Sequence, residues 1–440
     1  MRHVVGDFLG NSDGNVAIIV ALMLIPMLVL AGGATDLARF EAHRAQLQDG
    51  VDRAVLAAAS LQQSLPVETT VPEYLKSIPF LDEVTLEYDY STSLNSRTIS
   101  VTARYDMPTG FLPLIRIESL PIVVTATAEE RRSNLEISLL LDISGSMREG
   151  SPQKLSLLRP AAKQFIDQVL TAQNRPTTSI SIVPYAGSVN VGATVMNGVG
   201  VTRQHNYSSC IEIATSDYAS NVGLIPFNQR NQVPHFTQNH QGVNYPGLDW
   251  GYCPSEVTAI TYLSNDPNAL KAKIDAMRMA DGTGTGIAMK WGMMLLEPAA
   301  KPFIAQASTY GLVPPQFATR PAQFNDPDTI KIIVLMTDGA ISEQRRPNQY
   351  AYPRNPEGGS GNYTWYSATT ANTHLQSVCT RAKNNGVIVF TIAFQTNSTG
   401  RSQMQSCASG PSHYFDVSGL DIAGAFSAIA TAIQKVKLTQ

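Results

Sequence analysis

The chain has 440 residues, more than one ordinary hydrophobic core holds, and this length predicts two or three folded units. Hydrophobic residues make up 43% of the chain and charged residues 15%, a composition typical of a globular protein. The net charge of −3 provides no basic surface for nucleic acid, so we expect no nucleic-acid partner.

An apolar segment near the start of the chain predicts a membrane span. Residues 16–34 carry no charged side chain, and nineteen residues are enough to cross a hydrocarbon core as a helix. Pro26 interrupts the segment, which transmembrane helices tolerate. We therefore expect a short cytoplasmic N-terminus over residues 1–15 and a transmembrane helix over residues 16–34. Cleavage of a signal peptide after Gly32-Gly33-Ala34 is the alternative.

A helical pattern continues beyond this span, over residues 35–66. One face of the predicted helix is apolar, and its members are Leu37, Phe40, Leu47, Val51, Ala54, Val55, Ala58 and Leu61. The other face carries polar and charged side chains, among them Arg39 and Arg53. The apolar face predicts a packing partner, which is either the next domain of the same chain or a long helix of another subunit.

Several features of this N-terminal segment recur together in one known family. They are Gly14, Pro26 inside the apolar span, Gly32-Gly33-Ala34, Asp36, Arg39, Leu47-Gln48 and the alanine run at 57–59. The segment thereby resembles the start of TadG-like proteins of the tight-adherence (Flp) pilus assembly system. Relatives that a prepilin peptidase processes carry Glu five residues after the cleavage-site glycine, whereas Ile19 stands there in this chain.

The resemblance implies a protein of the inner membrane whose bulk is periplasmic, with other pilus assembly subunits as partners. A minor pilin-like structural subunit of the Flp pilus is the alternative that the same resemblance leaves open.

Residues 67–132 alternate between apolar and polar side chains with a period of two, which is typical of antiparallel strands with one wet face. The predicted strands are 84–90, 98–107 and 122–131. We expect a small β-rich segment that acts as a spacer or a packing platform for the long helix.

From Asn134 onward strand and helix patterns alternate, which predicts an α/β domain over residues 134–438 with a mostly parallel sheet and helices on both faces. The predicted strands are Leu135–Leu141, Ser179–Tyr185, Ile330–Met336 and Gly386–Phe394. The predicted helices are Gln153–Ala172, Asn268–Ala280, Thr285–Glu297, Ser367–Asn385 and Asp421–Val436. Residues 206–264 are too long for an ordinary connection, so we expect an inserted loop or subdomain there.

The four cysteines form no CxxC pair, so a zinc ribbon is not expected. Cys210 and Cys253 lie in the predicted insertion, and Cys379 and Cys407 follow later in the chain. Their order favours the disulfides 210–253 and 379–407, which would require an oxidising compartment. Other connectivities and four free buried thiols remain as alternatives.

Oxygen-bearing side chains gather where two apolar runs end. Asp142, Ser144 and Ser146 follow the first run, and Asp338 follows a later one. In open α/β sheets, ligands bind at the carboxyl ends of strands. Carboxylate and hydroxyl oxygens suit Mg²⁺ or Mn²⁺ rather than zinc. A simpler alternative is that the two serines cap the next helix.

The glycine-rich loop between the two runs adds a threonine, either Thr283 or Thr285. The combination of DxSxS, a loop threonine and a strand-end aspartate resembles the metal-ion-dependent adhesion site of von Willebrand factor A domains. The spacing to Trp291-Gly292 favours Thr283 in that family. The resemblance implies that these residues hold a divalent metal and that a protein partner completes the coordination with an acidic side chain.

Enzyme functions fit the sequence less well. A haloacid-dehalogenase-type phosphohydrolase carries a second carboxylate where Ser144 stands, and its catalytic lysine cannot be Lys331, which lies within the strand. Ser146 is not in a G-x-S-x-G elbow, and no P-loop is present. The histidines considered show no partner in the sequence and are expected at surfaces or caps; they are His205, His235, His240, His374 and His413. We therefore predict a non-enzymatic, membrane-anchored pilus assembly or adhesion protein.

Overall fold

The computed structural model describes residues 15–61, 63–92, 95–237, 249, 251–348 and 361–438. Nearly all of the predicted N-terminus at 1–15 and His240 lie outside these ranges. The chain divides into two compact units, Met1–Arg132 and Ser133–Gln440.

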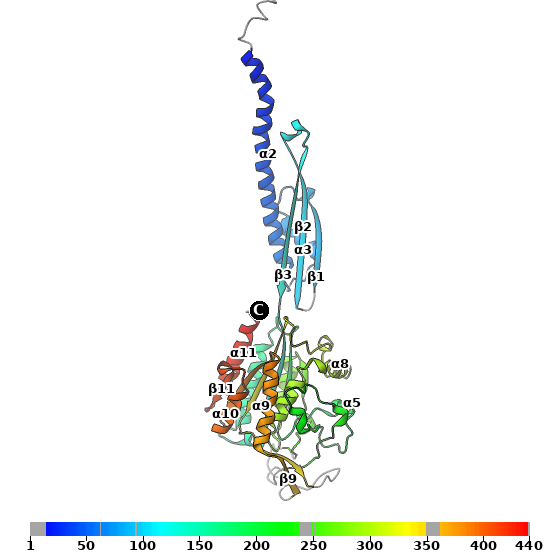
Figure 1. Ribbon diagram of the computed structural model, residues 1–440, viewed down its shortest axis with the longest axis vertical. Coiled ribbons are helices and arrows are strands. Elements are labelled where there is room, and N and C mark those ends of the chain that lie inside the picture. Colours follow the sequence, from blue (N-terminus) through cyan, green and yellow to red (C-terminus); the bar gives the residue numbers. More distant parts are fainter. Residues whose placement is uncertain are drawn as a thin grey trace, which may run out of the picture. The chain divides into compact units, whose positions relative to one another are not determined.

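The first unit is built on one long helix, α2 (Asn15–Ala58), which ends before the predicted limit at residue 66. The second half of α2 lies along a three-stranded antiparallel sheet, as Figure 1 shows. The remaining elements of this unit are α3 (Val67–Leu75), β1 (Thr85–Thr92), β2 (Ser96–Pro108), the short 3-10 helix η3 (Leu112–Ile115) and β3 (Ser119–Arg131). The predicted strands are thus confirmed, with β2 and β3 extending beyond their expected ends.

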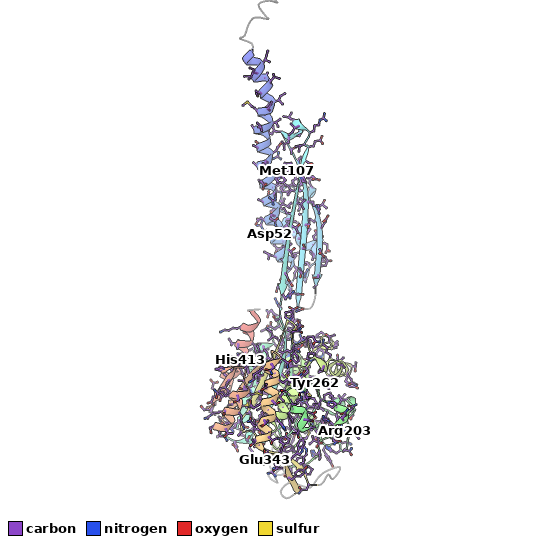
Figure 2. All side chains as sticks on the ribbon, in the orientation of Figure 1. Asp52, Met107, Arg203, Tyr262, Glu343 and His413 are labelled. Atoms are coloured by element: carbon purple, nitrogen blue, oxygen red, sulfur yellow. A yellow bond between two sulfur atoms is a disulfide. The ribbon has the colours of Figure 1, made fainter. Side chains whose placement is uncertain are left out.

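The apolar face of α2 packs on its own unit. Its buried members are Leu47, Val51, Ala54, Val55 and Ala58. They share a core with the inward-facing residues of β2 and β3, among them Met107 (Figure 2). The first of the two predicted packing partners, the same chain, is therefore the one that the structure shows. Leu37 is an exception, because its side chain is exposed.

The first half of α2 has no such cover. Among the described residues, α2 is the one helix that is long and apolar enough to cross a membrane. Most large apolar side chains between Ile18 and Leu30 are exposed, and Leu22 and Leu30 are the most exposed of them. Exposed apolar surface of this extent is rare on a water-soluble protein and marks a lipid or protein contact.

The second unit contains a six-stranded sheet in the order β11-β10-β7-β4-β5-β6. Its strands are β4 (Asn134–Asp142), β5 (Thr178–Tyr185), β6 (Thr261–Ser264), β7 (Thr329–Thr337), β10 (Ile388–Phe394) and β11 (Tyr414–Val417). Neighbouring strands are parallel except for β5 and β6, which are antiparallel. A separate two-stranded sheet consists of β8 (Gln344–Pro347) and β9 (Asn362–Tyr366).

Helices cover both faces of the large sheet (Figure 1). One face carries α4 (Lys154–Val169), α6 (Pro267–Ala276) and α11 (Ile422–Leu438). The other carries α5 (Ala193–Gly198), α7 (Thr285–Met294), α8 (Lys301–Thr309), α9 (Ala368–Asn384) and α10 (Ser398–Cys407). The five predicted helices are confirmed apart from small shifts at their ends.

The central strand β4 shows why the apolar run has no alternation. Leu139 and Leu141 face the core that α4 and α11 close, whereas Leu140 faces the core that contains α7. Both faces are buried, so both sets of side chains must be apolar. Gly292 of α7 lies against Leu140, and a Cβ at this position would come within 2.6 Å of the Leu140 side chain. The glycine therefore permits close packing of α7 on the strand.

The insertion predicted at 206–264 is wrong at its end, because Thr261–Ser264 form the edge strand β6 of the main sheet. Within the remainder, the Cys210–Cys253 disulfide packs against buried Val233, Phe236 and Tyr252, and among the described residues this cluster is separate from the main core. Other residues of the insertion, among them Ile211, Tyr218 and Phe227, pack into the main core. The second predicted disulfide, Cys379–Cys407, is also present and joins α9 to α10.

The expected surface position is wrong for three histidines. His205, His235 and His374 are buried. The ring centroids of His205, just before the insertion, and His235, within it, are 5.6 Å apart. Nε2 of His205 contacts the Val233 carbonyl, and Nδ1 of His235 contacts the Ser208 hydroxyl. These contacts give the two rings a packing role.

Candidate metal centre

The candidate site lies where the order of the large sheet reverses. The chain leaves β4 for β5 and β6 on one side and later returns to β7 on the other side. Asp142 is the last residue of β4, and Asp338 directly follows β7. Because β4 and β7 are adjacent and parallel, both carboxylates lie at the same edge of the sheet, at the switch point where ligands bind in doubly wound folds.

Asp142 is fully buried and held from both sides. Its Oδ1 accepts a hydrogen bond from the backbone N–H of Ser144 at 2.8 Å. Its Oδ2 accepts one from the hydroxyl of Thr337 at 2.7 Å. Thr337 ends β7, so the neighbouring strand fixes the orientation of this carboxylate, a role that the sequence analysis did not assign.

The two serine hydroxyls connect this strand end to the second carboxylate. Ser144 Oγ lies 3.0 Å from Ser146 Oγ, and the Ser146 hydroxyl donates to Asp338 Oδ1 at 2.7 Å. Neither serine caps α4, because the N-cap residue of this helix is Gln153 and no side chain caps it. We refer to Asp142, Ser144, Ser146 and Asp338 as the oxygen cluster.

A lysine that the sequence analysis missed completes the cluster. Lys154, the first residue of α4, is buried, and its Nζ donates to Asp338 Oδ2 at 2.9 Å. A positive charge in the first turn of a helix is unfavourable for the helix dipole, so its position there was a signal that an acidic partner exists. Lys331, in contrast, pairs with Glu136 at 2.6 Å inside the sheet and takes no part in the cluster.

The glycine-rich loop lies beside the cluster. Ala280 forms a parallel bridge with Ser144, and its N–H donates to the Ile143 carbonyl at 3.0 Å. Gly284 packs so closely on the backbone of Gly187 that a Cβ would come within 2.6 Å of the Gly187 carbonyl oxygen. The loop backbone therefore lies against two strand ends at once.

The two candidate threonines, Thr283 and Thr285, differ in burial and in their contacts. The Thr283 carbonyl accepts hydrogen bonds from Ser342 and from Gln344, and the residue is partly exposed. Thr285 is fully buried, and its hydroxyl faces that of Tyr185 without completing a hydrogen bond. The structure thus brings four of the five predicted residues into one bonded cluster and places the threonine loop next to it.

Burial dominates the electrostatics of the cluster. It raises the pKa of Asp142 to about 7, and the negative charge of Asp338 adds to the effect. Burial also raises the pKa of Asp338, although the Ser146 hydroxyl and the Lys154 ammonium act in the opposite direction. Two buried carboxylates of like charge are costly unless a cation compensates them, and Lys154 supplies one positive charge.

The donor set fits a hard divalent cation. Two carboxylates neutralise its charge, and hydroxyl oxygens add neutral ligands of the type that Mg²⁺ and Mn²⁺ accept. Among the described residues, no group of three or more His, Cys, Asp or Glu side chains could hold a metal. The candidate site therefore depends on hydroxyls as well as acids.

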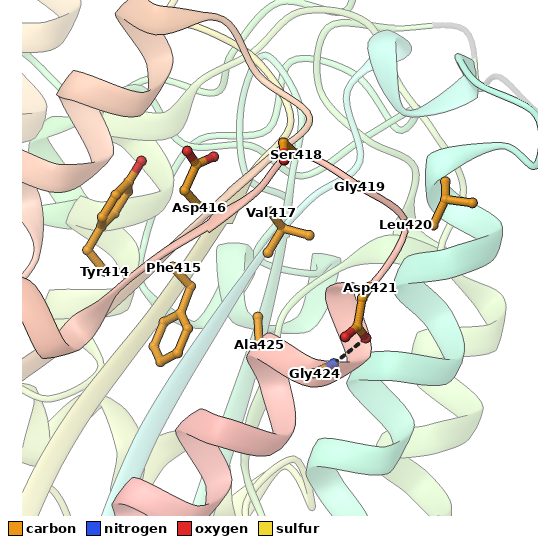
Figure 3. Close-up of a pocket in the computed structure, with 10 residues that line it drawn as sticks. All are labelled: Tyr414, Phe415, Asp416, Val417, Ser418, Gly419, Leu420, Asp421, Gly424 and Ala425. Atoms are coloured by element: carbon orange, nitrogen blue, oxygen red, sulfur yellow. Dashed lines mark hydrogen bonds between the residues drawn. The ribbon is translucent and has the colours of Figure 1, made fainter.

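A separate open pocket of about 470 Å³ lies at the end of β11. Figure 3 shows its lining, in which the Asp421 carboxylate accepts a hydrogen bond from the N–H of Gly424 at the start of α11. None of the lining residues belongs to the oxygen cluster, so this pocket is not part of the candidate site.

The sheet order, the antiparallel edge strand and the helices on both faces match the von Willebrand factor A-like fold that the sequence predicts. In the other unit, residues 14–61 match the family described as putative Flp pilus-assembly TadE/G-like. The chain therefore combines a TadE/G-like N-terminus with a von Willebrand factor A-like domain. No curated protein matches the chain.

Solved structures with a similar arrangement include proteins of pili. The pilus adhesin SpaC from Lactobacillus rhamnosus GG has 12% identity and a TM-score of 0.36, over 81% of this chain and 35% of the adhesin. The vWF domain of the type V pili tip protein Mfa5 from Porphyromonas gingivalis has 13% identity and a TM-score of 0.38, over 70% and 97%. The PilB minor pilin from Streptococcus sanguinis has 15% identity and a TM-score of 0.37, over 80% and 79%. The chain thus spans about a third of the length of the first of these proteins.

Proposed function

We propose that the chain is a non-enzymatic pilus assembly or adhesion protein, anchored in the inner membrane by α2, whose periplasmic domain binds a protein partner through Mg²⁺ or Mn²⁺. The observation that carries the proposal is the hydrogen bond from Ser146 to Asp338, which joins the DxSxS segment to the distant aspartate in one cluster. The match of residues 14–61 to the TadE/G-like family supports the pilus context.

In this proposal Asp142, Ser144, Ser146 and Asp338 hold the metal, and Thr283 supplies the loop hydroxyl. A metal with few protein carboxylates stays electrophilic and keeps exchangeable positions. An acidic side chain of the partner would fill such a position, so binding would depend on both the metal and the partner's charge.

The two disulfides support a location outside the cytoplasm, because such bonds persist in oxidising compartments. The bare, apolar first half of α2 supports anchoring in a membrane. Together these features favour an inner-membrane protein whose bulk is periplasmic.

The metal site is tested by thermal melting with Mg²⁺ and with a chelator. A ligand at a hundredfold excess over its Kd stabilises the folded state by about 2.7 kcal/mol, so we expect a rise in Tm of several degrees. Asp142→Ala and Ser146→Ala should remove the rise. Asp416→Ala is the matched control, because Asp416 is a partly exposed acid on β11 at the same sheet edge. A rise that persists in Asp142→Ala would disprove the site.

Partner binding is tested by pull-down from membranes with the full chain. A partner that is retained with Mg²⁺, lost with chelator and lost equally in Ser146→Ala would support the proposal. Retention that is insensitive to chelator would show that the cluster does not mediate binding.

A second candidate is a minor pilin-like structural subunit, and the bare half of α2 favours it, since other helices could cover this surface instead of lipid. Fractionation separates the two functions. Recovery of the chain in sheared pili supports the subunit, whereas recovery in the inner membrane supports the anchor.

A metal-dependent phosphohydrolase is the third candidate, and the contact of Lys154 with Asp338 is the one observation that favours it. Ser144 occupies the position where that chemistry needs a second carboxylate. We expect no hydrolysis of p-nitrophenyl phosphate with Mg²⁺, and a turnover that Asp142→Ala abolishes would establish the enzyme.

A further inference from the structure

The turn that joins β2 to β3 is unusually apolar for a surface turn. We call residues 109–118 the hairpin tip. Its large apolar side chains are exposed: Phe111 43%, Leu114 62%, Ile115 49% and Ile117 39%. Four such side chains on one short turn form a patch that soluble surfaces rarely show, so the patch indicates a contact.

The hairpin tip is fixed to α2 at one position along the helix, near Gly32 and Asp36. The Asp36 carboxylate accepts hydrogen bonds from the backbone N–H groups of Gly110, Phe111 and Leu112 at 2.9, 2.8 and 3.0 Å. Asp36 is 1% exposed, so these bonds are shielded from water. Gly32 lies directly against the tip, and a Cβ there would come within 2.3 Å of the Phe111 ring. The tip therefore lies on α2 next to the last turn of the apolar segment.

This position along α2 coincides with the end of the predicted membrane span, and so with the expected edge of a bilayer. Residues 16–34 of α2 span roughly 28 Å at 1.5 Å per residue, close to the thickness of about 30 Å of a hydrocarbon core. The large exposed apolar side chains of this segment end at Leu30, and two residues later Gly32 lies against Phe111 of the hairpin tip. Figure 1 shows β2 and β3 running along α2.

The backbone N–H groups of the hairpin tip are largely hydrogen-bonded within the protein, which suits a medium with little water. Asp36 accepts hydrogen bonds from three backbone N–H groups of the turn. Three more bonds form within the turn: the N–H of Thr109 donates to the Glu118 carbonyl, that of Arg116 to the Pro113 carbonyl and that of Ile117 to the Leu112 carbonyl. Satisfied backbone groups lower the cost of entry into an apolar medium. Arg116 is exposed on the tip and Arg39 is half exposed on α2, so both can contact anionic headgroups.

We propose that the hairpin tip is a second membrane contact, which inserts Phe111, Leu114, Ile115 and Ile117 into the periplasmic interface of the bilayer that α2 spans. The tip would fix the tilt and rotation of the unit, because two contacts constrain an anchor that a single helix leaves free to rotate. This inference rests on the membrane anchor proposed above.

The test uses the full chain in vesicles of phosphatidylethanolamine and phosphatidylglycerol with brominated acyl chains, which quench tryptophan by contact. Three variants report three positions: Leu114→Trp in the tip, Leu24→Trp in the apolar half of α2 and Leu65→Trp beyond the far end of α2. All three native side chains are exposed. The unsubstituted chain gives the baseline from its three tryptophans.

We expect bromines near the headgroups to quench the added fluorescence of Leu114→Trp at least twofold, with weaker quenching from deep bromines. Leu24→Trp should be quenched most by deep bromines, and Leu65→Trp should not be quenched. If Leu24→Trp is quenched and Leu114→Trp behaves like Leu65→Trp, the tip proposal is wrong and the anchor stands. A blue-shifted but unquenched Leu114→Trp would assign the tip to a protein partner or a second copy instead. If Leu24→Trp is not quenched, the anchor itself is wrong.

Discussion

Lys154 Nζ lies 2.9 Å from Asp338 Oδ2, while Oδ1 of the same carboxylate accepts the Ser146 hydroxyl. The domain therefore carries an internal cation at its candidate metal site. A divalent ion must share Asp338 with this ammonium group or displace it, and either event costs free energy because the ion pair is buried. We therefore expect Lys154 to weaken the binding of a metal at the proposed site.

Lys154→Met should raise the affinity for Mg²⁺ about tenfold or more, which corresponds to about 1.4 kcal/mol. The same change should lower the Tm in chelator, because it leaves two buried carboxylates without a cation. Isothermal titration and melting curves measure the two effects. Lys163→Met is the matched control, since Lys163 lies on the same helix in a partly exposed pair with Asp275. An unchanged or weaker affinity in Lys154→Met would contradict this role.

The raised pKa of Asp142 predicts a particular dependence of stability on pH. Burial raises this pKa to about 7 in the folded chain, against an ordinary value near 4. Between these values the folded state binds more protons than the unfolded state, so its free energy of unfolding falls as pH rises from about 4 to about 7. The titration of Asp142 should therefore lower the Tm measured in chelator as the pH rises from about 4 to about 7.

Asp142→Asn lacks the titrating group, so its Tm should fall less between pH 4 and pH 7 than the Tm of the wild type. The difference between the Tm profiles of the two proteins gives the contribution of Asp142. Mg²⁺ should oppose the decline, because it binds the ionised carboxylates. Profiles of the wild type and of Asp142→Asn that stay parallel from pH 4 to 7 in chelator would refute the assignment.

Thr283 and Thr285 give opposite predictions. Thr283→Val should weaken Mg²⁺ binding about tenfold with little change in the Tm of the metal-free protein, since its side chain is not needed for the loop contacts seen here. Thr285→Val should keep the affinity and leave stability equal or higher, because the buried Thr285 hydroxyl lacks a hydrogen bond. The reverse pattern in the same titrations would make Thr285 the ligand.

The sequence predicts the long elements of this fold well and the short ones poorly. β4 and β7 are long, doubly buried strands, so their apolar runs identify them. β6 and β11 have four residues each, too few for a recognisable pattern, and they become strands because longer neighbours offer free edges. The same limit explains why the end of the insertion was misplaced.

The candidate site shows a similar division. Strand ends and their polar residues are visible in sequence, which is why Asp142 and Asp338 could be paired across the chain. Contacts made by side chains that reach back from a helix or a neighbouring strand are not local in sequence. Lys154 and Thr337 enter the site in this way, and only tertiary packing places them beside the carboxylates.

The two disulfides should differ in what they hold together. Cys379–Cys407 joins two helices of the main core across 28 residues, whereas Cys210–Cys253 supports the insertion across 43 residues. The loop-entropy model gives each about 3–4 kcal/mol. We expect Cys379→Ser/Cys407→Ser to lower the Tm of the whole domain.

For Cys210→Ser/Cys253→Ser we expect proteolysis of the insertion before the sheet unfolds, since the described residues around this disulfide form a cluster separate from the main core. Limited proteolysis with mass spectrometry separates the two results. Equal protection of the insertion in both double variants would contradict the difference.

Asp36 should control whether the hairpin tip stays on α2. Hydrogen bonds from the backbone N–H groups hold the pKa of Asp36 below its ordinary value, with the largest effect from Gly110 and further effects from Phe111 and Leu112. The carboxylate therefore stays charged and continues to accept these hydrogen bonds. Asp36→Ala removes the acceptor of all three, and their amide hydrogen exchange should become at least tenfold faster. Asp49→Ala is the control, because Asp49 is an exposed acid on the same helix that pairs with Arg53. Slow exchange at these three amides in Asp36→Ala would show that other contacts hold the tip.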